Sequence, residues 1–211
     1  MGSEMSTGGR RPARGQAERR QAILDGAFAV FARRGYAQAC VKEIAQEAGV
    51  AKPTVYNHLN DKESLYREAV EAVADRVGAR GLAAVEQLRA SAADADPRTA
   101  LTAVARGLLS ALGDADATAV RQLACAQAVQ FPELAASVRE RTVLRPRSAL
   151  ADRLARLTLD GRLRACDPEL AAEHFLSLLT GSLEYRSDAA PDTVADTAVD
   201  VFLRAYGVLR A

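Results

Sequence analysis

The sequence predicts an all-α protein, and three observations lead to that expectation. Alanine, leucine, arginine and glutamate dominate the composition, which favours helix. Aromatic residues make up only 5% of the chain and do not cluster with β-branched residues as they do in strands. Apolar residues recur at helical spacing instead. With 211 residues, 49% of them hydrophobic, the chain can bury a substantial core.

Residues 1–16 are predicted to form a disordered basic arm, because they are rich in Gly, Ser, Pro and Arg and lack hydrophobic periodicity. Residues 1–67 carry a formal charge of +4, whereas residues 68–211 carry −3. A basic end on a slightly acidic body suits contact with a polyanion. The arm is either a solvated tail or a segment that lies along DNA phosphates or in a minor groove.

Residues 17–67 are predicted to form a small three-helix domain. The first helix, over residues 17–34, has one apolar stripe that includes Ile23 and Phe31, and Gly35 can end it in a left-handed conformation. Two shorter stripes follow within residues 37–67 and are separated at Gly49. Helices this short must pack on each other and on the first helix, which predicts a helix-turn-helix. Asn60 or Asp61 can cap the next helix.

The second short helix is predicted to present an uncharged polar face. Val55 and Leu59 mark its buried side, at about 100° per residue. The opposite side and its flanks carry Pro53, Thr54, Tyr56 and Asn57. Such side chains suit base edges and phosphate oxygens, and an Asn can bond an adenine edge with two hydrogen bonds. Asn57 is therefore the predicted base reader.

Two lysines are expected at helix starts. Lys62 and Lys42 fall in first turns, where the helix dipole disfavours a cation. A docked phosphate would be attracted both by the backbone N–H groups and by the ammonium. The alternative is that both are exposed lysines without a role.

Residues 21–70 resemble the N-terminal domain of the TetR family of transcriptional regulators. The matching elements are the helix from Ile23 to Gly35-Tyr36, then Val41-x-x-Ile44-Ala45-x-x-Ala48-Gly49-Val50, then Pro53-Thr54-Val55-Tyr56-x-His58-Leu59-x-x-Lys62-x-x-Leu65. The resemblance implies phosphate contacts from Thr54, Tyr56, His58 and Lys62. It implies base or groove contacts from Lys42, Lys52, Pro53 and Asn57.

The chain departs from this family at Ala39 and Cys40. The family usually has Ser or Thr there, where a hydroxyl caps a helix and touches the DNA backbone. The cap should be weaker here, by about 1 kcal/mol. Cys40 is either a thiol that is acidified at a helix start or, as we expect, a small buried residue.

Residues 68–211 are expected to form a helical ligand-binding and dimerisation domain. Residues 131–141 and 161–181 resemble a C-terminal domain found in a subset of the same regulators. Gly78 and Gly81 are expected to loosen the helix that begins near residue 62. Further helices are predicted near residues 97–112, 115–130, 132–159, 168–187 and 191–209.

The last two of these helices are the predicted homodimer interface. Their stripes contain Leu176, Leu179 and Leu183 on one helix and Val194, Ala198, Val201 and Phe202 on the other. Packed on the same pair from a second subunit, they would form a four-helix bundle. Alternatively, the stripes face the core of their own subunit. A dimer fits the resemblance, because two helix-turn-helices spaced about 34–36 Å apart read a palindrome.

Ligand contacts are predicted among polar residues on otherwise apolar helices, although each could instead be an ordinary core or surface residue. The candidates are Gln122, Gln127, Gln130, His174, Ser177 and Tyr185. The expected function is a ligand-responsive repressor that binds a palindromic double-stranded DNA operator as a dimer. The alternative keeps DNA binding but makes the larger domain a docking surface for a protein partner.

Several other classes are not expected. The chain lacks a phosphate loop, a paired acid and base, or a nucleophile and base at recognisable spacing, so we do not expect an enzyme. Its three cysteines and two histidines have no metal-ligand spacing, so we expect no metal or cofactor. It has no apolar run of transmembrane length and no signal-peptide core, so we expect a cytoplasmic protein without membrane contact.

Overall fold

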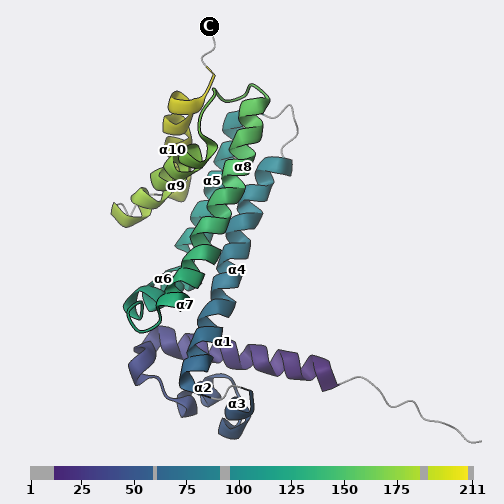
Figure 1. The fold of residues 1–211 in the computed structure, drawn as a ribbon, viewed down its shortest axis with the longest axis vertical. Coiled ribbons are helices and arrows are strands. Elements are labelled where there is room, and N and C mark those ends of the chain that lie inside the picture. The colour runs from purple at the N-terminus through teal and green to yellow at the C-terminus, as the bar shows by residue number, and fades with distance from the viewer. Residues whose placement is uncertain (1–11, 59–60, 91–95, 186–189, 209–211) are drawn as a thin grey trace, which may run out of the picture. The chain divides into compact units, whose positions relative to one another are not determined.

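The computed structural model describes residues 12–58, 61–90, 96–185 and 190–208. Within these ranges the secondary-structure elements are helices, joined by turns and by one isolated bridge between Leu163 and Gly207, which confirms the predicted all-α class (Figure 1). The chain divides into two compact units, and the division falls after Val70.

The first unit contains α1 (Pro12–Gln38), α2 (Val41–Glu47), α3 (Lys52–His58) and the start of α4 (Lys62–Ala90). Helix α1 begins at Pro12, so residues 12–16 are helical and were wrongly assigned to a disordered arm. Residues 1–11 of that arm lie outside the described residues. Gly35 has φ 75° and ψ 166° and interrupts the helix where its left-handed conformation was predicted.

The apolar stripes of the first unit face inward. Ile23 and Phe31 of α1, Ile44 of α2 and Val55 of α3 are each at most 1% exposed. The ring of Tyr66, at the start of α4, packs edge-on against Phe31 with centroids 4.9 Å apart. The short helices thus bury their apolar stripes, and α2 packs on both α1 and α3, as the sequence predicted.

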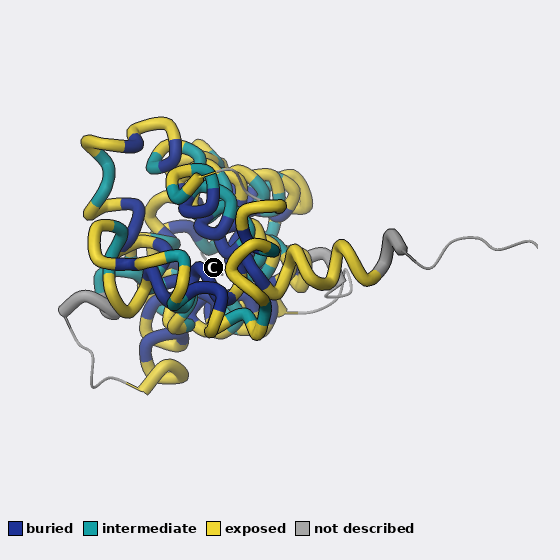
Figure 2. The backbone as a smooth tube through the Cα atoms, turned by 90° about the horizontal axis from the view of Figure 1, so that it is seen from below, coloured by how far each residue is buried: buried dark blue, intermediate teal, exposed yellow. Residues whose placement is uncertain are grey.

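The second unit contains the rest of α4 and six further helices. These are α5 (Pro97–Gly113), α6 (Ala115–Ala126), α7 (Pro132–Arg139), α8 (Arg145–Leu159), α9 (Pro168–Tyr185) and α10 (Pro191–Tyr206). A π-helical segment, Glu140–Leu144, joins α7 to α8 within the single helix expected over residues 132–159. Figure 2 shows buried and exposed residues alternating along the chain, as expected for helices that are buried on one side.

Gly78 does not loosen α4, contrary to expectation, because the helix continues to Ala90. A Cβ atom at Gly78 would lie 2.4 Å from the carbonyl oxygen of Arg141 in the π-helical segment. Arg141 also pairs with Asp75 at 2.7 Å and with Glu71 at 3.5 Å. The glycine therefore allows two backbones to pack in direct contact.

The prediction that the apolar stripes of α9 and α10 form the dimer interface is largely wrong. Leu179, Val194, Ala198 and Phe202 are between 0 and 8% exposed and lie in the hydrophobic core of their own unit. Leu176 is half-buried against the same core, and the side chain of Leu183 lies outside the description. Val201, at 43% exposed, is the member of the stripe that faces outward. Periodicity located the apolar side of each helix, but that side packs within one chain.

Candidate functional site

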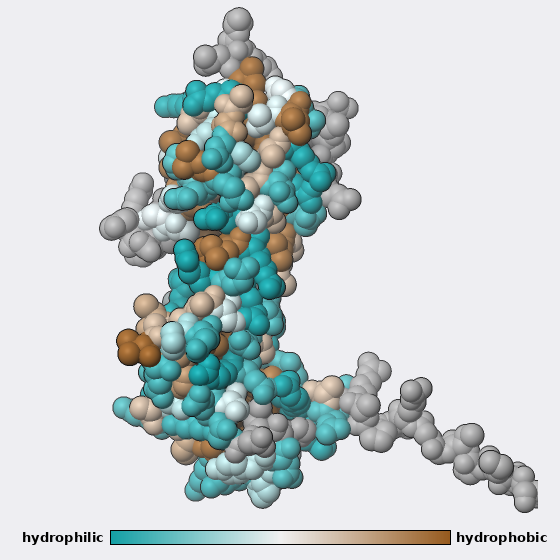
Figure 3. Space-filling model, viewed as in Figure 1, coloured by the Kyte–Doolittle hydropathy of each residue, from teal (hydrophilic) through white to brown (hydrophobic). Residues whose placement is uncertain are grey.

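Helix α3 presents an uncharged polar face. Val55 anchors the helix at 1% exposure, whereas Tyr56 is 45% exposed. Pro53 and Asn57 are exposed and Thr54 is half-buried, while the side chain of His58 lies outside the description. On the side visible in Figure 3 the surface of the first unit is mostly hydrophilic. The predicted residues thus share an accessible face on which polar atoms can meet a ligand.

The turn between α2 and α3 fixes the placement of this face. Gly49 has φ 64°, and the N–H of Val50 donates to the carbonyl of Ala45 at 3.0 Å. A Cβ at Gly26 of α1 would lie 2.9 Å from the backbone nitrogen of Ala48. Gly26 is therefore needed for the close approach of α1 and α2. Sequence reasoning missed it, although a glycine inside an apolar helical stripe was a signal.

The basic residues of the first unit fall into two groups. Arg33 pairs with Glu47 at 3.0 Å and with Glu43 at 3.2 Å, and Arg34 pairs with Glu43 at 3.2 Å. Hydrogen bonds from these guanidinium groups, Arg33 first, lower the pKa of the Glu43 carboxyl. These pairs link α1 to α2 and leave little net charge between them.

The lysines are arranged differently. Lys42 and Lys52 are exposed, and the Lys52 ammonium lies 5.9 Å from the centroid of the Tyr56 ring. Within the described parts of the chain, neither lysine forms an ion pair with a carboxylate. Both charges therefore remain available to an anion, and that of Lys52 lies beside the face of α3.

The start of α4 is capped by Asp61, one of the two predicted caps. Its carboxylate accepts a hydrogen bond from the backbone N–H of Ser64 at 2.7 Å, and this bond lowers the pKa of the Asp61 carboxyl. Lys62 is half-buried, and its ammonium donates to the carbonyl of Ala37 at 3.0 Å. It also lies 4.9 Å from the centroid of the Tyr36 ring. Lys62 thus has a structural contact that sequence reasoning did not anticipate.

Cys40 lies at the N-cap position of α2 and makes no side-chain capping hydrogen bond, as expected for a thiol in place of a hydroxyl. The expectation that Cys40 is buried is wrong, because its side chain is exposed. The neighbouring Ala39 is buried instead, at 3% exposure. The smaller alanine faces the core, and the thiol is left at the surface.

The second unit contains a cavity of about 360 Å³. Aliphatic side chains from α4, α5, α8 and α9 form much of its wall, and Ser177 is the predicted ligand candidate that lines it. A separate hollow of about 330 Å³ lies between α9 and α10 beside His174 and Ser177. The Nδ1 atom of His174 lies 2.6 Å from the Tyr206 hydroxyl there.

The other ligand candidates lie elsewhere. Gln122 and Gln130 are exposed, and Gln127 is half-buried at the end of α6. None of the three lines either hollow. The side chain of Tyr185 lies outside the description.

Two further searches covered the described residues only. None of their helices is long and apolar enough to cross a membrane. They also contain no group of three or more His, Cys, Asp or Glu side chains that could hold a metal ion.

Two family descriptions match the chain, one in each part. Residues 23–69 match the N-terminal domain described as bacterial regulatory proteins, tetR family. Residues 99–208, more than half of the chain, match the C-terminal domain described as AefR-like transcriptional repressor.

Relatives and a solved structure agree with these matches. The chain is 37% identical over 73 residues to the HTH-type transcriptional repressor Rv1474c of Mycobacterium tuberculosis, a segment that covers 31% of this chain and 39% of that protein. It is 42% identical over 60 residues to the HTH-type transcriptional activator FasR of Mycolicibacterium smegmatis, covering 28% and 27%. The chain thus spans less than two fifths of the length of these relatives. The crystal structure of a TetR-family regulator from Mesorhizobium loti is 30% identical, with a TM-score of 0.79, over 92% of this chain and 98% of that one.

Proposed function

Because this chain belongs to the TetR family of bacterial transcriptional regulators, we propose that it is a ligand-responsive repressor that binds a palindromic operator as a dimer. The observation that carries the proposal is the exposed, uncharged face of α3, on which Asn57 and Tyr56 are accessible; Lys42 and Lys52 are exposed in the same unit and form no ion pair with any described carboxylate. Hydrogen-bonding groups flanked by cations suit base edges between two phosphate backbones. An operator on the bacterial chromosome would require the chain to act in the cytoplasm.

Each residue of this surface has a proposed role. Asn57 reads a base edge, because it is exposed and can form two hydrogen bonds with adenine. Phosphates are bound by Thr54, Tyr56, His58 and Lys62, and the groove is lined by Lys42, Lys52 and Pro53. The ammonium of Lys62 has three N–H donors, so its bond to Ala37 leaves donors for a phosphate oxygen.

The proposed dimer uses the outward faces of α9 and α10. Leu170 is 47% exposed and Val201 is 43% exposed, and the hollow beside His174 lies on the same pair of helices. Exposed apolar side chains around a shallow hollow suit a self-complementary contact. The proposed interface thus keeps Val201 of the predicted stripe and replaces its buried members with other outward-facing residues of the same two helices.

The cavity in the second unit favours a small-molecule effector over a protein partner. A solid core would leave no space for a ligand, whereas about 360 Å³ is within the range of small-molecule sites. Ligand binding would shift the balance between two conformations only if the ligand binds one of them more tightly. Helix α4 provides a covalent connection, since Val77 and Gly81 line the cavity and the same helix begins at Lys62.

The test is selection of bound fragments from a random DNA pool with the full chain. We expect an inverted repeat with half-sites one or more helical turns apart, and a complex that contains two chains per site. Asn57→Ala, run in parallel, should relax the selected base preference at one position of each half-site. Enrichment without symmetry, or one chain per site, would contradict the dimeric proposal. A reporter gene placed behind the selected site then decides between repression and activation.

A further inference from the structure

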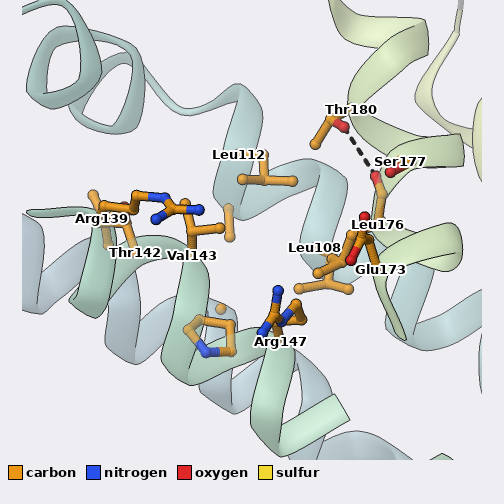
Figure 4. Close-up of a pocket in the computed structure, with 14 residues that line it drawn as sticks. Leu108, Leu112, Arg139, Thr142, Val143, Arg147, Glu173, Leu176, Ser177 and Thr180 are labelled. Carbon is orange, nitrogen blue, oxygen red and sulfur yellow. Dashed lines mark hydrogen bonds between the residues drawn. The ribbon is translucent and has the colours of Figure 1, made fainter. Parts of the chain in front are cut away.

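The cavity in the second unit has charged groups at its margins and an aliphatic interior. Leu108 and Leu112 of α5, Val143 of the π-helical segment and Leu176 of α9 supply apolar wall. Figure 4 shows the charged Arg139 and Glu173 on opposite sides of the space. A ligand that fills it would therefore have an apolar body and one polar end.

The two arginines at the cavity are incompletely partnered. Arg139 is exposed, and within the part of the chain that the structure describes it forms no ion pair. Arg147 pairs with Glu169 at 3.4 Å, but its buried Nε–H group has no hydrogen-bond partner. A guanidinium group has five N–H donors and no acceptor, so both side chains call for a ligand with acceptor oxygens.

The hydroxyl groups at the cavity do not change this requirement. Thr142 donates to the carbonyl of Val138 at 2.9 Å, and Thr180 donates to the carbonyl of Leu176 at 3.0 Å (Figure 4). Their hydrogens are thus used within their own helices. The donors that remain for a ligand are the guanidinium N–H groups and the Ser177 hydroxyl.

We propose that this cavity binds an amphipathic monocarboxylate, with its carboxylate on Arg139 and its aliphatic body along Leu108 and Val143. Planar carboxylates match the fork of a guanidinium group and form charge-assisted hydrogen bonds with it. The assignment rests on the proposed function, because it supplies the chemical class of the effector.

Ligands of other charge fit less well. A dianion would need a second uncompensated cation, but Arg147 is already paired with Glu169. A cation could pair with Glu173, but it would leave the Arg139 guanidinium without an acceptor. Arg139 is thus the lining cation that keeps no ion pair within the described part of the chain, and it lies across the space from Glu173, so we place a single carboxylate on it (Figure 4).

The test is calorimetric titration of the full chain, without DNA, with octanoate, octanamide and octylamine. The three probes share an alkyl chain and differ in the charge of the head group. We expect octanoate to bind at least about tenfold more tightly than octanamide, and octylamine to bind most weakly. Equal binding of acid and amide, tighter binding of the amine, or no binding of any probe would overturn the assignment.

A matched pair of variants locates the carboxylate. Arg139→Gln should weaken octanoate binding about tenfold and remove the preference over octanamide. Arg156→Gln, on the exposed side of α8 and away from the cavity, should leave both unchanged. Thermal unfolding of both variants checks that they fold. An unaltered preference in folded Arg139→Gln would overturn the role of Arg139.

A separate measurement distinguishes this assignment from the proposed function. Octanoate is added to the complex of the chain with its selected operator, and release of DNA is followed by anisotropy. Acid-selective binding with DNA release supports both proposals. Acid-selective binding without release supports the carboxylate site and contradicts ligand-responsive regulation by this ligand class.

Discussion

The ammonium of Lys62 donates a hydrogen bond to the backbone carbonyl of Ala37, 3.0 Å away, and so joins the start of α4 to the end of α1. A cation that is both a structural contact and a proposed phosphate ligand affects folding and binding together. Lys62→Gln can separate the two roles, because an amide retains a donor for Ala37 but carries no charge.

For Lys62→Gln we expect weaker binding to all DNA sequences and little change in the free energy of unfolding. The slope of log K against log salt should become shallower by about 0.9, the contribution of one phosphate. Lys62→Ala should lose both the phosphate and the Ala37 contact, at a stability cost of about 1 kcal/mol. Filter binding at several salt concentrations checks the slope, and an unchanged slope in Lys62→Gln would contradict the phosphate role.

Asn57→Ala should act on specificity rather than on general affinity. We expect a loss of about 1–3 kcal/mol on the selected operator, with a relaxed preference at one base pair of each half-site. Competition binding against operators with single base changes measures this effect. If every operator weakens by the same factor, Asn57 does not read a base.

Gly26→Ala should destabilise the first unit, although alanine is the better helix former. Its Cβ would meet the backbone of Ala48 at 2.9 Å, and we expect a loss of about 1–3 kcal/mol. Gly15→Ala in the same helix is the control, since its Cβ meets no atom within 4 Å. That substitution should stabilise the helix by up to about 1 kcal/mol. Denaturant unfolding of both variants compares the two glycines directly, and equal gains would refute the close approach.

Cys40→Ser should strengthen the cap of α2. A serine hydroxyl can accept a hydrogen bond from the free backbone N–H groups of the first turn, with a gain of about 1 kcal/mol in unfolding free energy. Cys125→Ser, at an exposed position within α6, should give no such gain. A similar change in both variants would show that the effect is not capping.

The stability of the first unit should fall at alkaline pH. Burial raises the pKa of Tyr66 to about 12, from an ordinary value of 10.0. The unfolded chain therefore loses this proton first, and stability is lost as pH rises from about 10 to 12, by about 3 kcal/mol in total. Tyr66→Phe should reduce this decline and leave the part due to Tyr36, whose pKa burial also raises, while Tyr56→Phe, at an exposed ring, should retain the decline in full. Denaturant unfolding at pH values between about 9 and 12, in steps of roughly one pH unit, tests this prediction. A decline in Tyr66→Phe as large as that of the unchanged chain would refute it.

Local periodicity was enough to predict the helices of the first unit, because each short stripe has only one way to be buried. Val55 marked the inner side of α3, and Asn57 then had to face outward. The same reasoning failed for Phe202, since a period shows which side of a helix is apolar but not what covers it. Contacts between distant segments, such as Arg33 with Glu43, leave no periodic signal. The cavity arises from five α-helices and the π-helical segment, so Arg139 could not be predicted to line it.

The contact at Gly78 has a mechanical consequence for the second unit. No side chain separates the backbone of α4 from the carbonyl of Arg141. A movement of one backbone relative to the other therefore cannot be absorbed by a change of side-chain rotamer. Val77 and Gly81 flank that contact on one element and Thr142 and Val143 continue from it on the other, and all four line the cavity. A ligand that moves these walls apart must therefore rotate α4 about this rigid contact.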